Sequence, residues 1–277
     1  MGLRIATNIA SQNVQKNLKE VSNEGNSTLE KLSSGKRITR ASDDAAGLAI
    51  ATNLEAQTKG LRQATRNAND GISLVQTAEG GLNETTNILT RLRELTIQAS
   101  SDTVGETERG FLDKEYQQLT KEIDRISEST VFNGTQLLNG EGKGSMDFQV
   151  GAFAGDQNRI TFESSESDSS ASSIGVSGTS ISEKDSALDA ISNVDTAIEK
   201  VSGQRATLGS IQSRLQSTVK NLEVQTINQD SARSVIQDVD VAEASASLAS
   251  NSVVKNAGVA TLAQANQIPM SALRLIG

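Results

Sequence analysis

One segment, Ser129–Ser182, lacks the helical spacing of apolar residues that governs the rest of this chain. Before it and after it, apolar side chains recur every three or four residues, which is typical of amphipathic helices. A chain with helix on both sides of one turn-rich segment is expected to run out, turn and come back. We therefore predict a mainly α fold, an elongated antiparallel helical rod in which both termini lie at the same end.

The turn-rich segment itself predicts a small β-hairpin, at about residues 130–163. Asn-Gly pairs stand at 133–134 and 139–140, which is turn chemistry. Residues 146–150 and 159–163 have the composition of short strands. The Ser-rich tract 164–182 that follows has few large apolar residues, and we predict a solvent-exposed surface loop there.

The composition excludes several classes of function. The chain of 277 residues has no Cys and no His, which removes thiolate nucleophiles, the usual zinc ligands and Ser-His triads. The net charge of −8 argues against a nucleic-acid partner, and no apolar stretch is long enough for a membrane span. We therefore expect no enzyme activity, no metal and no cofactor.

Both ends of the chain carry narrow apolar stripes that a single helix cannot bury by itself. The first stripe consists of branched aliphatic residues near the start: Ile5, Ile9, Val14, Leu18, Val21, Leu29 and Leu32. The second stripe has mostly small side chains, which let helices approach closely: Ala246, Ala249, Val253, Ala257, Ala260 and Ile268. Chains with such unsatisfied ends assemble, so we predict that these stripes are polymerisation surfaces.

Four sequence motifs identify a family resemblance. They are LSSGKRITRASDDAAGLAI at 32–50, GISLVQTAEGGLNE at 71–84, FNG at 132–134 and LAQANQIP at 262–269. In this order they closely resemble bacterial flagellin, over residues 1–162 and 185–277. The tract between those two ranges stands where larger flagellins carry outer domains, so the chain resembles the compact type that lacks them.

The resemblance implies a domain organisation and a function. Residues 1–42 with 236–277 would form a terminal coiled-coil domain in the inner core of the filament. Residues 43–235 would form a helical rod domain that carries the hairpin and the Ser-rich loop. The implied function is a structural subunit that polymerises into the flagellar filament for motility, with terminal helices that fold on assembly.

Further implications concern location and partners. The resemblance implies export to the extracellular flagellum by the flagellar type III route, without a cleaved signal peptide. The main partner would be the chain itself, in a helical homopolymer. An export chaperone, the filament cap and hook-junction proteins would be further partners.

Two alternatives remain from the sequence. A hook–filament junction protein of the same family shares the terminal regions, although the motifs at 76–84 and 132–134 favour flagellin. An enzyme displayed on a flagellin scaffold would need an inserted domain with ligands, and the chain has no Cys or His to supply them.

A segment near residue 91 resembles the part of some flagellins that the animal toll-like receptor for flagellin binds. The string is TRLRELTI, residues 90–97. Carried over by position, Arg91, Leu95 and Glu115 would contact the receptor. The alternative is structural, with Leu95 packed on Leu119 and Arg91 paired with Glu94 on the same helix.

Overall fold

The computed structural model describes residues 7–140 and 144–274, and side chains as far as residue 267. Its helices are α1 Ile9–Ser34, α2 Ala45–Ala99, α3 Glu106–Ser129, α4 Ala171–Ile174, α5 Lys184–Gln237 and α6 Val241–Arg274. Its strands are β1 Val131–Phe132, β2 Thr135–Gln136, β3 Ser145–Gln149 and β4 Arg159–Glu163, with short 3-10 turns at Asp156–Asn158 and Ser165–Ser167. The mainly α fold class is confirmed.

Two of the helices are unusually long, and no proline interrupts them. α2 has 55 residues and α5 has 54. The single proline, at position 269, lies outside both. Glycine inside α2 has a packing role at Gly81, where a Cβ would come within 2.6 Å of Leu138 Cδ1. The missing side chain lets the loop after β2 approach this helix closely.

The chain divides into two compact units. The larger unit is Gln57–Ile227, and the smaller one combines Met1–Ala56 with Asn228–Gly277. The limits of the larger unit fall inside α2 and α5, whereas the family resemblance placed the domain limits near residues 42 and 236. The predicted division into domains stays a prediction.

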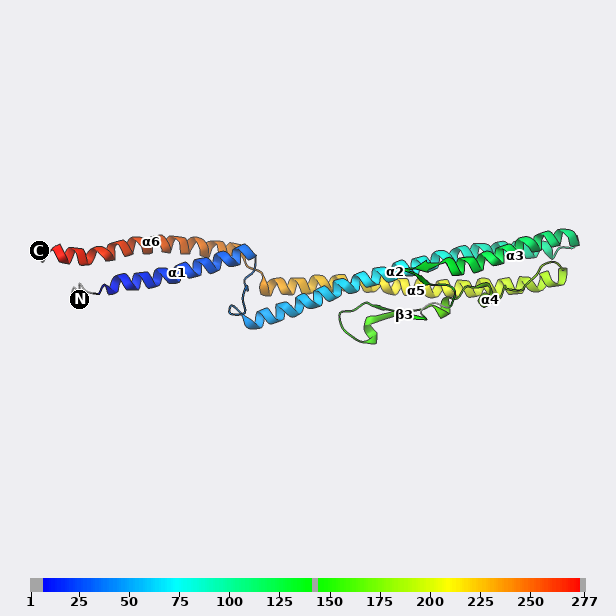
Figure 1. Cartoon of the computed structure of the whole chain (residues 1–277), viewed down its shortest axis with the longest axis horizontal. Helices are drawn as coiled ribbons and strands as arrows, with labels where there is room; N and C mark the ends of the chain where they lie inside the picture. The colour runs from blue at the N-terminus through cyan, green and yellow to red at the C-terminus, as the bar shows by residue number, and fades with distance from the viewer. Residues whose placement is uncertain (1–6, 141–143, 275–277) are drawn as a thin grey trace. The chain divides into compact units, whose positions relative to one another are not determined.

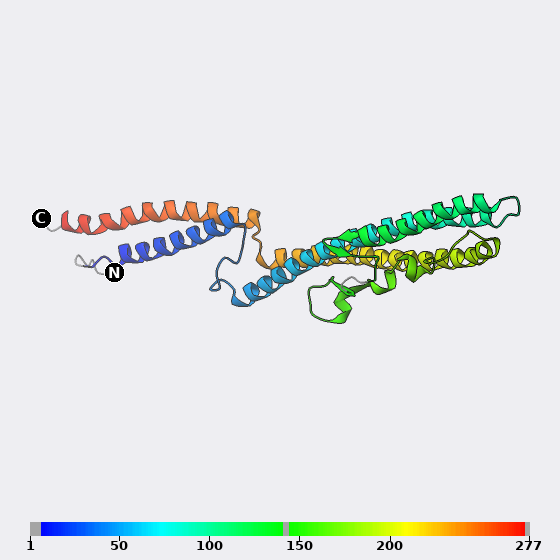
Figure 2. The same ribbon diagram turned by 45° about the vertical axis from the view of Figure 1, so that its right-hand side comes forward.

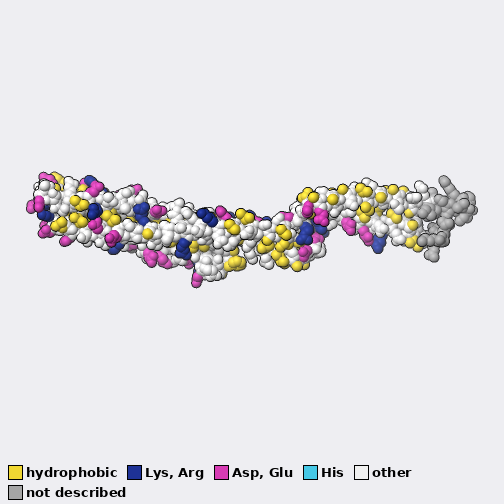
Figure 3. All heavy atoms as spheres, turned by 180° about the vertical axis from the view of Figure 1, so that it is seen from behind, with side chains coloured by type: hydrophobic (Ala, Val, Ile, Leu, Met, Phe, Trp, Pro, Cys, Tyr) yellow, Lys and Arg dark blue, Asp and Glu magenta, His cyan; other side chains and the backbone are white. Residues whose placement is uncertain are grey.

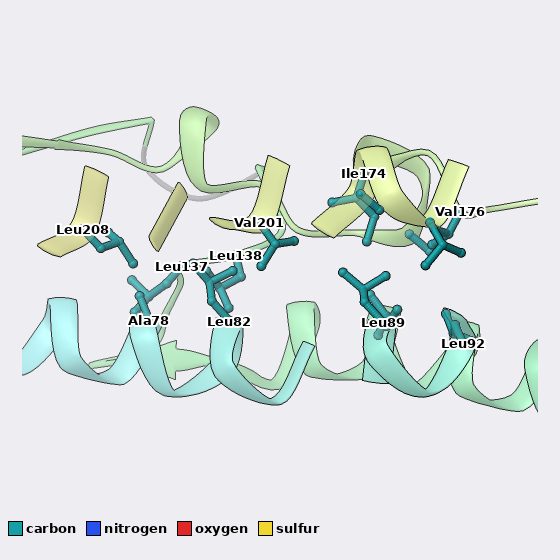
Figure 4. Packing of buried hydrophobic residues seen from close by; sticks show 14 of the residues in the cluster. Ala78, Leu82, Leu89, Leu92, Leu137, Leu138, Ile174, Val176, Val201 and Leu208 are labelled. Atoms are coloured by element: carbon teal, nitrogen blue, oxygen red, sulfur yellow. The ribbon is translucent and has the colours of Figure 1, made fainter. Parts of the chain in front are cut away.

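In the larger unit, α2, α3 and α5 run side by side (Figures 1 and 2). α2 and α5 are antiparallel, since Arg93 Nε lies 2.7 Å from Asp195 Oδ1 near one end and Leu61 clusters with Leu222 near the other. The buried side chains from α2 and α5 point toward one another in the core (Figure 4). The core includes Ala78, Leu82, Leu89, Leu92, Leu95, Leu137, Leu138, Ile174, Val176, Val201 and Leu208.

The predicted hairpin is confirmed, and a second, smaller one precedes it. β3 and β4 pair antiparallel with Met146 opposite Phe162. Phe162 is fully buried, which fixes the hairpin on the helices. β1 and β2 pair through two residue pairs only, and their turn is Asn133-Gly134 with φ values of 49° and 77°. Those φ values are typical of a two-residue hairpin turn.

The Ser-rich tract is exposed at Ser172, Ser173 and Ser177 among others but packs one side on the core, so the prediction of a solvent-exposed loop is wrong for that side. Its few apolar residues are almost completely buried, and three of its serines are buried with them: Ala171, Ile174, Val176, Ile181, Ser164, Ser167 and Ser169. Ser164 Oγ and Ser169 Oγ donate to the carbonyls of Leu137 and Leu138. Serine hydroxyls thus satisfy buried carbonyl groups, and the tract covers the core with only a few apolar side chains.

In the smaller unit, α1 and α6 lie side by side in opposite directions (Figures 1 and 2). Asn8 Nδ2 donates to the carbonyl of Ala265 at 2.9 Å near one end of the pair. Near the other end, Lys36 forms an antiparallel bridge with Asp238.

Candidate functional site

Both ends of α1 are defined by local chemistry. The Asn8 side chain caps the helix by accepting a hydrogen bond from the Ser11 N–H at 3.1 Å. Gly35 ends the helix in the left-handed conformation, with φ of 70°. Ser11 Oγ then donates to Asn266 Oδ1 at 2.9 Å. These bonds fix the start of α1 against the far part of α6.

α6 contacts α1 through a face that the sequence prediction missed. Its buried or half-buried residues follow a spacing of three, four and seven: Ala244, Leu248, Asn251, Gly258, Leu262 and Ala265. A Cβ on Gly258 would lie 3.1 Å from Leu18 Cδ1, so the two helices approach closely there. This period exists in the sequence, but alanines and valines on every side of α6 conceal it.

The predicted stripe on α6 lies on the other side of the helix. Ala246, Ala249, Val253, Ala257 and Ala260 are all exposed. Successive residues of an α-helix are rotated by about 100° about its axis. A residue two positions after one that faces α1, as Val253 is after Asn251, therefore points almost directly away from α1. Val253 is 67% exposed, and Val241, Val254 and Val259 each expose about half of their surface or more. Figure 3 shows hydrophobic side chains spread over the surface of this unit.

The predicted stripe on α1 divides between two environments. Val14, Leu18, Val21 and Leu32 are half-buried, whereas Ile9 and Leu29 are 52% and 53% exposed. Ile5 lies outside the described residues, as does the side chain of Ile268. Elsewhere the outer surface of α1 is polar, for example at the exposed pair Lys16–Glu20. α1 therefore has one apolar side, and α6 has at least two.

The α1–α6 pair buries few of its residues. Among those whose side chains the structure describes, Ser11 in α1 and Ala244 and Ala265 in α6 are the buried ones. An open surface groove of about 310 Å³ is lined by Leu18 and Leu262 together with polar neighbours. A second surface groove, of about 380 Å³, is lined mainly by serines and charged residues of the two helices, among them Ser27 and Ser247. The pair by itself therefore has only a thin core.

Residues 35–44 and 238–240 form a structured junction within this unit. The Arg37 N–H donates to the carbonyl of Gln237, and its guanidinium Nη2 donates to the carbonyl of Ile236, at 2.7 and 2.6 Å. The Val239 N–H donates to the carbonyl of Gly35 at 3.1 Å. Arg37 thus satisfies carbonyl groups at the end of α5, where the helix leaves them without partners.

Asp43 closes the same junction and gives it a pH dependence. Asp43 Oδ2 accepts from the Thr39 N–H, the Arg40 N–H and the Thr39 hydroxyl, each at 3.0 Å. These bonds lower the pKa of Asp43 below its ordinary value of 3.8, and Lys31 adds a smaller effect. The hydrogen bonds of the ionised Asp43 carboxylate stabilise the folded chain fully above the ordinary pKa of 3.8. This stabilisation is lost as the pH falls through the lower pKa that Asp43 has in the folded chain.

We expect the junction to loosen on acidification below pH 3.8. As the pH is lowered, the protection of residues 36–44 against hydrogen exchange should fall more steeply in the unchanged chain than in the Asp43→Asn variant. Glu24→Gln, an exposed carboxylate on α1, serves as the control and should behave like the unchanged chain. Equal pH profiles for the unchanged chain and Asp43→Asn would remove Asp43 from this role.

The residues of the predicted receptor segment separate into surface and core. Arg91 donates to Glu115 Oε1 through Nε and Nη2 at 3.0 and 2.8 Å, and also pairs with Glu94 at 3.0 Å. All three side chains are about half exposed or more. Leu95 has no exposed surface, so a direct receptor contact by its side chain is contradicted. Its side chain belongs to the core cluster of the larger unit.

Within residues 7–140 and 144–274, no cluster of three or more acidic side chains could hold a metal ion. No helix in the same ranges is long and apolar enough to cross a bilayer.

Two family models match most of the chain. The bacterial flagellin N-terminal helical region matches residues 5–143, and the bacterial flagellin C-terminal helical region matches residues 191–276. The chain belongs to the bacterial flagellin family. This flagellin is 42% identical to a flagellin of Halalkalibacterium halodurans over 269 residues, which cover 97% of this chain and 98% of the relative.

Other relatives agree in identity and in length. A flagellin of Bacillus subtilis is 39% identical, with 99% of this chain and all of the relative covered. A crystal structure of Bacillus cereus flagellin is 32% identical, with a TM-score of 0.50 over 57% of this chain and 88% of that one. A flagellar filament core protein of Brachyspira hyodysenteriae is 38% identical over 98% of this chain. None of these names supports the hook–filament junction alternative.

Proposed function

We propose that this flagellin is the structural subunit of a flagellar filament, and that the exposed face of α6 carries contacts between copies. The supporting observation is that α6 presents apolar residues both toward α1 and away from it. A helix that is apolar on all sides is normally buried. Burying the part of each valine that is still exposed contributes about 1 kcal/mol, so a partner that covers several of them gains considerable free energy.

The partner is a second copy of the same chain. The outer surface of α1 is mostly polar, so it does not match the apolar face of α6. Another α6 does match, because alanines and valines on both helices permit close approach. When one such contact is repeated head to tail without closing, it generates a helical filament. In this arrangement α6 lies between its own α1 and the neighbouring copies.

We further propose that α1 and α6 complete their folding only on assembly. Ordering the backbone costs roughly 1–2 kcal/mol per residue, and the α1–α6 pair buries few of its described residues. Neighbours that cover the outer face of α6 supply the missing apolar contacts. Folding and binding are then coupled at the growing end.

The proposal extends to export and to helper proteins, which membership of the flagellin family suggests. An uncovered apolar helix invites aggregation before assembly. The proposal therefore includes an export chaperone that covers α6, passage through the flagellar type III route to the extracellular flagellum, and contacts with the cap and hook-junction proteins.

Deleting residues 244–277 tests the function directly. The shortened chain should keep the core of the larger unit, because that core draws on residues 68–215. Electron microscopy under polymerising conditions should show no filaments, and circular dichroism should still show a cooperative helical fold. Filaments from the shortened chain would contradict the proposal.

We propose Arg91 and Glu115, without Leu95, as contacts for a host toll-like receptor. Both side chains are exposed and lie on adjacent helices. Arg91→Ala should reduce receptor signalling by the monomer in a reporter assay, while costing about 1 kcal/mol of stability or less, because exposed ion pairs contribute little. Arg125→Ala, which removes the similar exposed pair with Glu122, is the matched control and should signal normally. Equal signalling by both variants would exclude Arg91.

A further inference from the structure

The turn between β1 and β2 presents an asparagine and a glycine to solvent. Both Asn133 and Gly134 are exposed. A Cβ built on Gly134 would meet nothing within 4 Å. In the part of the chain that the structure describes, the Asn133 side chain has no hydrogen-bond partner. The side-chain amide and the following main-chain nitrogen are therefore both free to react.

The strand pairing leaves the Gly134 nitrogen without a ladder bond. Val131 pairs with Gln136, and Phe132 pairs with Thr135, so the flanking residues make the hydrogen bonds of this hairpin. Two residue pairs alone give marginal stability to a hairpin. Local opening of this turn therefore costs little free energy, and the open turn can adopt backbone angles that the closed turn does not reach.

We infer that Asn133 is a site of slow covalent self-modification. The main-chain nitrogen of Gly134 attacks Cγ of Asn133, the new N–C bond closes a five-membered imide, and the Cγ–Nδ2 bond breaks. The nitrogen loses its proton to the departing group, which leaves as ammonia. Water then opens the imide at either carbonyl and yields aspartate or isoaspartate, so the only co-reactant is water.

A second Asn-Gly pair in the same chain provides an internal comparison. Asn139 is half-buried, and its Nδ2 donates to Gln136 Oε1 at 2.7 Å. A Cβ on Gly140 would lie 2.9 Å from Asp168 Oδ2, so this turn is crowded. The preceding residue, Leu138, is fully buried. Attack on Asn139 first requires that a hydrogen bond be broken and that a packed segment be moved.

The modification changes the local fold as well as the charge. A carboxylate replaces a neutral amide at the tip of the hairpin. The isoaspartate product also adds one carbon to the main chain inside a two-residue turn, and the pairing of Val131 with Gln136 no longer fits. The β1–β2 pairing should open in chains that carry isoaspartate.

Peptide mass spectrometry on the intact, folded chain tests this inference. Trypsin releases residues 126–143 as one peptide that contains both asparagines. After incubation in mildly alkaline buffer, fragment ions locate the amide-to-acid exchange, and electron-transfer fragmentation separates aspartate from isoaspartate. Because one hydrogen bond protects Asn139, conversion at Asn133 should be about fivefold faster or more.

The same experiment in denaturant supplies the control. Unfolding removes the structural difference, so the two asparagines should then convert at similar rates. Conversion at Asn139 that equals or exceeds conversion at Asn133 in the folded chain would overturn the inference, as would an unchanged Asn133 after Asn139 has converted.

Discussion

Replacing Val253 by glutamate is expected to abolish filament formation without unfolding the larger unit. Val253 is 67% exposed in the single chain and points away from α1, so the substitution should be tolerated there. In the proposed filament the same position is buried against another α6. An unpaired carboxylate there costs roughly 3 kcal/mol or more per contact, which raises the concentration needed for assembly by about a hundredfold or more.

Sedimentation and electron microscopy under polymerising conditions measure this effect. The matched control is Asn17→Glu, which places the same charge on the exposed surface of α1. The control should polymerise nearly as well as the unchanged chain. Normal filaments from Val253→Glu, or an equal loss in the control, would contradict the assignment of the interface to α6.

Replacing Ile174 by alanine should destabilise the larger unit by about 2–5 kcal/mol, because it leaves a cavity in a packed core. Ile174 is 1% exposed and belongs to the same cluster as Leu89 and Val201. Denaturant unfolding followed by circular dichroism gives the change in the free energy of unfolding. Ser173→Ala, one residue earlier and exposed, should change it by about 0.5 kcal/mol or less.

This pair of variants also decides what the Ser-rich tract does. If the tract is a plain surface loop, both substitutions should lower the free energy of unfolding equally and only slightly. If the tract covers the core, Ile174→Ala alone should lower it strongly. If Ile174→Ala is as stable as Ser173→Ala, the packing of this tract against the helices is wrong.

Helix positions and the hairpin were predictable from the sequence, because each depends on local signals. The spacing of Leu82, Leu89 and Leu92 predicts one buried face of α2, and these residues are fully buried. The turn at Asn133-Gly134 follows from the φ values that asparagine and glycine tolerate. Such signals do not depend on the rest of the chain.

The Ser-rich tract was not predictable in this way. Its burial depends on three separated apolar residues, Ile174, Val176 and Ile181, that meet a surface built by distant helices. Neither a helical nor a strand period connects them. Low hydrophobicity over a window predicts exposure, but a few well-placed side chains and serine hydroxyls that bond to buried carbonyls outweigh that average.

The candidate interface was partly predictable. Small apolar residues on α6 were recognised, but the sequence does not say which of its apolar sides faces α1. The observed contact through Gly258 and Leu262 assigns one side to α1 and leaves the Val253 side uncovered. Similarly, Leu95 and Arg91 are neighbours on α2, and only the packed fold separates the buried residue from the exposed one.

Hydrogen exchange of monomer and filament, measured by mass spectrometry, tests most directly the claim that assembly completes the fold. Peptides that contain Leu18 in α1 and Val253 in α6 should exchange rapidly in the monomer and become protected together in the filament. A peptide that contains Leu89 in the larger unit should be protected in both states. Strong protection of Leu18 and Val253 in the monomer would contradict the account.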